Sequence, residues 1–104
     1  MVATYCFDID GTLCSQETSD YRMAVPNESR IRRVNELFLE GHTIKLFTAR
    51  GSKSGVDWAE VTKIQVTEWG LLHHELILGK PHADHYIDDK AIHSESFDWD
   101  SRIE

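Results

Sequence analysis

FDIDGTL, at residues 7–13, follows directly on an apolar run that begins at Val2. An apolar run of this length that ends in acidic residues and glycine predicts a buried strand leading into a loop. Successive side chains of a strand point to opposite faces, so Asp8 and Asp10 are expected on the same face. Two carboxylates this close repel each other, and a bound divalent cation or a shared proton removes that conflict. The segment therefore predicts a hard metal ion, acid/base chemistry, or both.

The sequence after this segment predicts a flap and then a helix. The first strand is expected at about residues 3–8, and residues 14–25 are polar and turn-rich, as in a flap over the end of that strand. Asn27 is expected to cap the helix, and Gly41 is well placed to end it. The apolar positions of this helix recur at three- and four-residue spacing and are Ile31, Val34, Leu37 and Phe38.

Three more strands and a second helix complete the predicted order. Strands are expected at residues 43–47 and 76–78, which are short and largely apolar, and at residues 85–87, which run into Asp88 and Asp89. Between the first two of them, Asp57 is expected to cap a helix that ends at Gly70. The partly apolar face of this helix is expected to consist of Trp58, Val61, Ile64, Gln65 and Trp69.

The alternation of strands and helices predicts one α/β domain with a parallel sheet over residues 1–104. Residues 91–104 have a weak pattern and are expected to form a short helix or a packed C-terminal arm. Ligands of parallel α/β sheets bind outside the carboxyl ends of the strands. A residue suited to chemistry follows each of the four expected strands, and these residues are Asp8 with Asp10, Thr48, Lys80, and Asp88 with Asp89.

The two acidic clusters together suit Mg²⁺. This ion prefers one or two carboxylates, with waters and phosphate oxygens as its other ligands. Capped turns and a solvated strand end are the alternatives, and each cluster alone is a modest signal. Because both clusters are expected at the same edge of the sheet, metal binding is favoured, with the ligands Asp8, Asp10, Asp88 and Asp89.

Other positions at this edge suit a phosphate group or a substrate. Thr48 offers a hydroxyl, and Ala49 belongs to a strand end whose backbone amides suit phosphate oxygens. Lys80 lies between glycine and proline, although a surface role is usual for lysine. Arg50 has the planar fork that matches phosphate or carboxylate, although an exposed arginine is the usual case. His82 is a candidate substrate contact, and its spacing to another histidine is only weak evidence for a transition-metal site.

The composition argues against some classes of binding partner. The formal charge of −7 argues against an electrostatic grip on nucleic acid, and no stretch is apolar enough to span a bilayer. If the four aspartates form one metal site, the remaining 11 positive and 14 negative charges leave only −3. Two cysteines and the lack of a signal peptide predict a reducing compartment, the cytoplasm. Cys6 is expected to be buried in the first strand, and Cys14 is expected near the site.

Four motifs in order resemble those of the haloacid dehalogenase-like (HAD) superfamily of phosphotransferases. They are FDIDGTL at 7–13, LFTAR at 46–50, GKP at 79–81 and YIDDK at 86–90. The resemblance covers about residues 3–92 and implies a small Rossmann-like sheet of about four strands, in the order 4-1-2-3, with helices on both faces. The compact form also resembles small members associated with capsule or surface-polysaccharide biosynthesis.

The resemblance implies a role for each motif residue. Asp8 would be the nucleophile that forms an aspartyl-phosphate, and Asp10 would protonate the leaving oxygen and then activate water. Thr48, Ala49 and Lys80 would hold the phosphoryl oxygens. Mg²⁺ would be held by Asp8, the backbone carbonyl of Asp10 and Asp88, with Asp89 as direct or indirect support.

The spacing of the motifs leaves no room for a cap domain, because only 37 residues separate Asp10 from Thr48. Residues 14–25 are then the only flap over an open site. We expect a phosphomonoesterase of a small phosphorylated sugar or polyol, with a homo-oligomer as a possible cover for the site. The alternatives are a nucleotidase, a phosphatase of nucleic-acid ends, and a non-catalytic phosphate-binding module.

Overall fold

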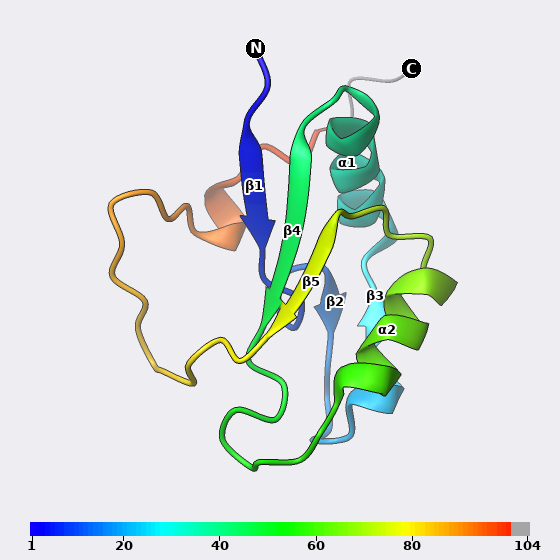
Figure 1. Cartoon of the computed structure of the whole chain (residues 1–104), viewed down its shortest axis with the longest axis vertical. Helices are drawn as coiled ribbons and strands as arrows, with labels where there is room; N and C mark the ends of the chain where they lie inside the picture. The colour runs from blue at the N-terminus through cyan, green and yellow to red at the C-terminus, as the bar shows by residue number, and fades with distance from the viewer. Residues whose placement is uncertain (101–104) are drawn as a thin grey trace.

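The computed structural model describes residues 1–100 and has a parallel sheet at its centre. Strands β1 (Thr4–Phe7), β4 (Thr43–Thr48) and β5 (Glu75–Leu78) lie in the order β1-β4-β5 (Figure 1). Phe7 pairs with Leu46, and Thr48 pairs with Leu78, so all three strands end at the same edge. The predicted α/β class with a parallel sheet is confirmed in this smaller form.

The middle strand, β4, carries the core. Its side chains alternate between buried and partly buried, and Ile44, Leu46 and Thr48 all point to the buried face. A period of two is typical of a strand with one face covered. The core cluster extends from these residues to Val34 on one helix and Val66 on the other.

Helix α1 (Glu28–Leu39) forms as the sequence predicts. The side chain of Asn27 accepts a hydrogen bond from the Arg30 backbone N–H at 3.2 Å, which satisfies one of the free donors of the first turn. Gly41 follows the last turn with φ of 100°, a conformation that glycine adopts without strain. The buried apolar residues of the helix are Ile31, Val34 and Leu37, with Phe38 partly buried.

Helix α2 (Ala59–Glu68) differs from its predicted form in its cap and its buried face. Trp58 occupies the N-cap position, although the Asp57 carboxylate still accepts a hydrogen bond from the Ala59 N–H at 2.9 Å. Gln65 of the predicted face is buried, but Ile64 is 49% exposed, and Thr62 and Val66 are buried although they were not predicted to be. The apolar pattern did not predict the whole buried face of α2, because Thr62 and Gln65 on that face accept hydrogen bonds from the Arg50 side chain.

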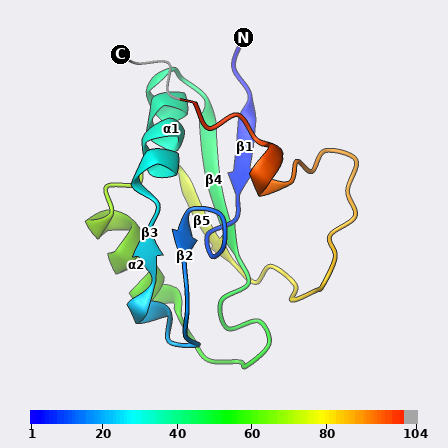
Figure 2. The same ribbon diagram turned by 180° about the vertical axis from the view of Figure 1, so that it is seen from behind.

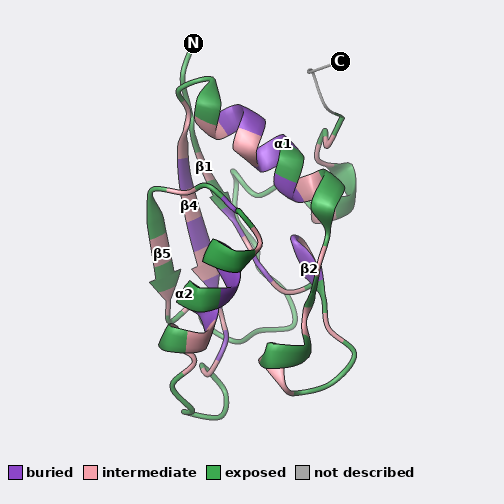
Figure 3. Ribbon diagram, turned by 90° about the vertical axis from the view of Figure 1, so that its right-hand side faces the viewer, coloured by how far each residue is buried: buried purple, intermediate pink, exposed green. Residues whose placement is uncertain are grey.

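Both helices lie on the same face of the sheet, and the prediction of helices on both faces is wrong (Figure 3). The connections β1–α1–β4 and β4–α2–β5 cross the sheet in the same direction. Right-handed crossovers in one direction place both helices on one side. Cys6 points to the opposite face and is exposed, so its predicted burial is also wrong. No helix within residues 1–100 is both long enough and apolar enough to span a membrane.

The 14–25 segment forms a hairpin beside the carboxyl ends of the strands (Figure 2). Strand β2 (Cys14–Ser15) pairs antiparallel with β3 (Val25–Pro26), and a 3₁₀ turn, η1 (Tyr21–Met23), lies between them. The Asn27 N–H donates to the Leu13 carbonyl at 2.8 Å, which holds the base of the hairpin at the start of α1.

The predicted fourth strand at residues 85–87 does not form. Residues 79–93 contain no strand and leave the sheet as an extended loop (Figure 1). Ile87 is 98% exposed. The Tyr86 hydroxyl donates to the Pro81 carbonyl, and the Lys80 ammonium lies 4.5 Å from the centre of the Tyr86 ring. Tyr86 thus makes its contacts within the loop. Without the fourth strand, β1 is an outer strand of the sheet. Of the predicted strand order 4-1-2-3, only the first three predicted strands form within residues 1–100, as β1, β4 and β5.

The C-terminal arm packs on β1 and α1 after a 3₁₀ turn, η2 (Ser94–Ser96). The Phe97 ring lies 5.6 Å from Phe7 and 4.7 Å from Trp99, centroid to centroid, in edge-to-face geometry. The Arg30 guanidinium lies over the Trp99 ring at 4.8 Å. A packed arm is therefore confirmed as far as residue 100, and the rest of the predicted arm, 101–104, lies outside the described residues.

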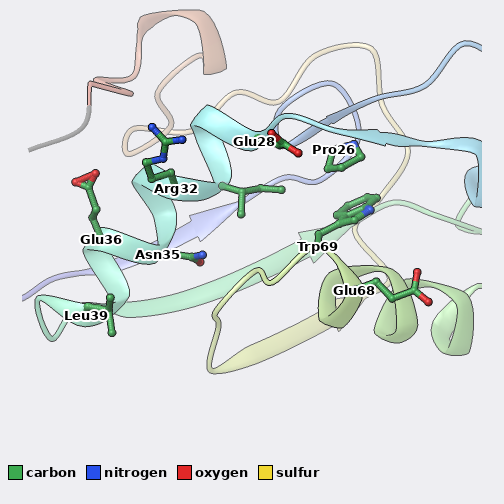
Figure 4. Close-up of a pocket in the computed structure, with 9 residues that line it drawn as sticks. Pro26, Glu28, Arg32, Asn35, Glu36, Leu39, Glu68 and Trp69 are labelled. Carbon is green, nitrogen blue, oxygen red and sulfur yellow. The ribbon is translucent and has the colours of Figure 1, made fainter. Parts of the chain in front are cut away.

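A hollow of about 490 Å³ lies between α1 and the end of α2 (Figure 4). Trp69 and Pro26 line one part of it, and Leu39 lines another. None of the residues that line it belongs to the motifs of the strand ends. This hollow is thus separate from the site built below.

We predict that Phe97→Ala lowers the free energy of unfolding by about 2–3 kcal/mol, because it removes a partly buried aromatic ring from the packing on β1. Urea unfolding followed by circular dichroism measures the change. The control is Ile92→Ala in the same arm, which is 63% exposed and should change stability by less than about 0.5 kcal/mol. Equal stability of the two variants would show that the arm does not support the fold.

Candidate active site

Asp8 and Lys80 meet at the carboxyl ends of the strands. Asp8 follows β1 directly, and Lys80 follows β5 by two residues. The Lys80 N–H donates to the Thr48 carbonyl at 3.1 Å, which fixes the lysine backbone beside the end of β4. The Lys80 ammonium donates to Asp8 Oδ1 at 3.4 Å, and the Thr12 hydroxyl donates to Asp8 Oδ2 at 3.0 Å. The structure thus joins two of the predicted motifs, which are 72 positions apart in the chain.

This pair is reachable from solvent. The Asp8 side chain is 35% exposed and the Lys80 side chain is 18% exposed. An ion pair in such a place is screened and contributes little to stability. A carboxylate that is partly exposed beside a cation can still meet a ligand, which a fully buried one cannot.

Asp10 has a different partner, Arg50. Arg50 Nε donates to Asp10 Oδ2 and its Nη2 donates to Asp10 Oδ1, both at 2.9 Å. Two parallel bonds from one guanidinium fix a carboxylate in both position and plane. The Cys14 thiol also donates to Asp10 Oδ1, at 3.3 Å, as its expected position near the site implied.

The Arg50 side chain is fully buried, with 0% exposure. Its Nη1 donates to Thr62 Oγ1 at 3.2 Å and to Gln65 Oε1 at 2.5 Å, both on α2. The guanidinium also lies 4.8 Å from the centre of the Tyr21 ring in the hairpin. The usual exposed position of an arginine therefore does not hold here. Sequence reasoning missed Thr62 and Gln65, whose only signal was two polar residues three apart on an otherwise covered helix face.

The Thr48 side chain makes its hydrogen bond within the turn that follows β4. Its side chain is 1% exposed, and its hydroxyl accepts a hydrogen bond from the Arg50 N–H at 3.1 Å. The Ala49 carbonyl accepts from the Ser52 N–H at 2.9 Å. Both residues lie at the predicted edge of the sheet, and the phosphate contacts proposed for them stay predictions.

The remaining predicted residues lie in the exposed loop. His82, Asp88 and Asp89 are all exposed. The Lys90 N–H donates to Asp88 Oδ1 at 2.9 Å, and this bond, together with the interaction between the Asp88 and Asp89 side chains, holds the pKa of Asp88 below its ordinary value. Asp88 and Asp89 therefore stand apart from Asp8 and Asp10 in this structure.

The arrangement does not assemble the predicted Mg²⁺ site. Within residues 1–100, no three His, Cys, Asp or Glu side chains form a group that could hold a metal ion. Asp8 faces an ammonium and a hydroxyl, and Asp10 faces a guanidinium and a thiol. The donor set at the strand ends is thus incomplete without the carboxylates of the 79–93 loop.

The surroundings of Cys14 suppress its thiolate. Burial raises the pKa of the Cys14 thiol to about 12, and the Asp10 carboxylate adds to the rise. Partial burial of its thiol also raises the pKa of Cys6, although the residue as a whole is exposed. Cys14 is thereby a hydrogen-bond donor to Asp10 and a poor nucleophile.

The fold has a counterpart among solved structures. A crystal structure of an MCSG target from Vibrio cholerae is similar to this chain with a TM-score of 0.79 and 28% sequence identity. The match covers 90% of this chain and 85% of the other. Neither the protein-family models nor the curated proteins give a match. The comparisons therefore support the small parallel α/β fold.

We predict that iodoacetamide at pH 8 modifies Cys6 and leaves Cys14 at least about tenfold slower. A thiol with a pKa raised to about 12 stays neutral at pH 8, and its thiolate forms only near pH 12. Mass spectrometry of the single variants Cys14→Ser and Cys6→Ser follows each thiol separately. Rapid modification of Cys14 at pH 8 would contradict its burial beside Asp10.

Proposed function

We propose that this chain is a phosphomonoesterase of the haloacid dehalogenase type, which works through an aspartyl-phosphate on Asp8. The observation that carries the proposal is the Asp8–Lys80 pair at the carboxyl ends of the strands. Ligands of open α/β sheets bind at this edge. A partly exposed carboxylate with a cation beside it is suited to receive a phosphate monoester.

The charges explain why the pair is needed. A carboxylate and a phosphate monoester are both anionic, so they repel each other unless a cation offsets the charge. Lys80 is within 3.4 Å of Asp8 and supplies a positive charge where the phosphoryl oxygens would lie. The Thr12 hydroxyl at 3.0 Å fixes the other oxygen of Asp8. Together these contacts orient the nucleophile.

The reaction then has two steps. An Asp8 oxygen attacks phosphorus, the bond from phosphorus to the ester oxygen breaks, and the Asp10 proton passes to that oxygen. In the second step Asp10 takes a proton from water, and the water oxygen attacks phosphorus. The bond between phosphorus and Asp8 breaks, which releases inorganic phosphate and restores both carboxyl groups.

Mg²⁺ belongs to the proposal on the strength of the sequence motifs. The ion would neutralise phosphate charge when bound, with Asp8, the backbone of Asp10 and Asp88 as its ligands and Asp89 as support. Because Asp88 and Asp89 lie on the 79–93 loop, that loop has to approach the strand ends for the ion to bind. The roles of Asp8, Lys80 and Thr12 derived above do not depend on this movement.

The substrate proposed is a small phosphorylated sugar or polyol. The hairpin at residues 14–25 lies beside the strand ends, and it is short. A net charge of −7 disfavours polyanionic nucleic acid. A small, uncharged leaving group is therefore the best match to this edge.

We predict that the purified protein releases phosphate from 4-nitrophenyl phosphate in the presence of Mg²⁺, and that Asp8→Asn abolishes this activity. An amide is too weak a nucleophile to form the phosphoryl intermediate. EDTA should also remove the activity, and added Mg²⁺ should restore it. Phosphate release that persists in Asp8→Asn would overturn the covalent mechanism. A panel of sugar phosphates and nucleotides then ranks the two substrate classes.

We also predict that Lys80→Met lowers kcat by about 10²–10³-fold, because it removes a cation from the developing charge. Its thermal midpoint should change little, since the pair with Asp8 is partly exposed. The matched control is Lys53→Met in the exposed loop after β4, which should retain full activity. Equal activity of Lys80→Met and Lys53→Met would remove Lys80 from the site.

A further inference from the structure

We infer that Arg50 is the positioning residue of Asp10, and that together with Cys14 it leaves Asp10 Oδ2 as the oxygen that faces the substrate. This inference rests on the proposed function. Its basis is the buried fork of Arg50, which holds both oxygens of Asp10 at 2.9 Å. The role is distinct from the substrate contact that the sequence predicted for this arginine.

Nearly all of the N–H donors of the Arg50 side chain make hydrogen bonds within the protein. A guanidinium has five N–H donors. Four hydrogen bonds from Arg50 go to Asp10, Thr62 and Gln65, with two to Asp10 and one to each of the others. The side chain is 0% exposed. A group so placed cannot also grip a phosphate in solvent.

Contacts from α2, from the hairpin and from the neighbouring backbone fix the Arg50 side chain. Thr62 and Gln65 hold Nη1 from α2, and the Tyr21 ring covers the guanidinium from the hairpin. The backbone on either side is fixed as well. The Arg50 N–H donates to Thr48 Oγ1, and Gly51 lies so close to Val56 that a Cβ there would stand 2.1 Å from its carbonyl oxygen. The Arg50 guanidinium is therefore held in one position, and its two hydrogen bonds fix the orientation of the Asp10 carboxylate.

The two oxygens of Asp10 are left unequal. A carboxylate oxygen has two lone pairs. Oδ1 accepts from Arg50 Nη2 and from the Cys14 thiol, to which it lies closer, at 3.3 Å, than the Ile9 carbonyl does, at 3.6 Å. These two donors occupy both lone pairs. Oδ2 accepts from Arg50 Nε alone, so one lone pair remains. The Asp10 side chain is 23% exposed, so the carboxylate is not sealed from the open end of the sheet.

This geometry assigns the proton transfers to one atom. In the first step the proton on Oδ2 passes to the ester oxygen as the bond from that oxygen to phosphorus breaks. In the second step Oδ2 takes a proton from the attacking water as the bond between Asp8 and phosphorus breaks. An Asp10 that is free to rotate would present this oxygen only part of the time.

The test compares two kinds of ester. 4-Nitrophenolate leaves without a proton, whereas the alkoxide of glycerol 1-phosphate needs one. Loss of positioning at Asp10 should therefore slow the first step selectively for the alkyl ester. The second step is the same for both esters, so the comparison uses kcat/KM, which reports on the steps up to formation of the aspartyl-phosphate. We expect Arg50→Met to lower kcat/KM by about 10²-fold or more on glycerol 1-phosphate and by less than about tenfold on 4-nitrophenyl phosphate. Asp10→Asn should show the same pattern, Arg50→Lys should fall between, and the exposed-site control Arg32→Met should match the wild type.

A milder variant covers the case in which Arg50→Met fails to fold. Thr62→Val keeps the shape of a fully buried side chain but removes one hydrogen bond to Arg50. It also removes the bond from the Thr62 hydroxyl to the Trp58 carbonyl. Thr67→Val is its matched control, because the Thr67 hydroxyl makes the same kind of bond, to the Lys63 carbonyl, on the exposed side of α2. We expect a selective loss on the alkyl ester, smaller than that of Arg50→Met, in Thr62→Val alone.

The outcomes separate the two proposals. A wild-type protein that is inert on both esters would overturn the proposed function and the inference with it. An active wild type whose Arg50→Met and Thr62→Val variants lose kcat/KM equally on both esters would overturn the inference alone, since a merely structural role lowers both values together. Selective loss on the alkyl ester, shared with Asp10→Asn, supports it.

Discussion

The buried fork between Arg50 and Asp10 is the interaction on which the arrangement of the site depends. It joins the loop after β1 to the loop after β4, and through Thr62 and Gln65 it reaches α2. The Tyr21 ring adds the hairpin to the same cluster. Removing one partner of a buried ion pair typically costs about 3–5 kcal/mol, because the other charge is left uncompensated. Four segments thus share one guanidinium, and a change at any of them is felt at Asp10.

The parallel sheet supplies the second constraint. Its strands end in register, so residues that follow β1 and β5 come together although 72 positions separate Asp8 from Lys80. The backbone bond from Lys80 to Thr48 completes this alignment. The two aspartates consequently have different surroundings. Asp8 faces a solvent-accessible ammonium, whereas Asp10 is held by a buried guanidinium, and this difference supports unequal roles for two residues of one motif.

Sequence patterns predicted most of the fold and failed at specific places. The cap at Asn27, the end of α1 at Gly41 and the three strands depend on local chemistry and on short apolar runs, which a sequence displays. The predicted strand at residues 85–87 does not form. Ile87 is the one aliphatic residue of this stretch, and Tyr86 makes its contacts within its own loop. The prediction of helices on both faces failed because the handedness of the crossovers, and not the apolar pattern, decides the side.

The sequence by itself determined the alternation of strands and helices as far as β5 and the identity of the residues that follow these strands. These follow from residue type and spacing, which are properties of the chain. Only the tertiary structure decided that Lys80 pairs with Asp8, that Arg50 is buried against Asp10, and that Asp88 and Asp89 stand apart in the exposed loop. Such pairings depend on which loops the sheet brings to one edge and which side chains the helices enclose. That information lies in three-dimensional packing, because contacts between distant residues leave no periodic trace in a single sequence.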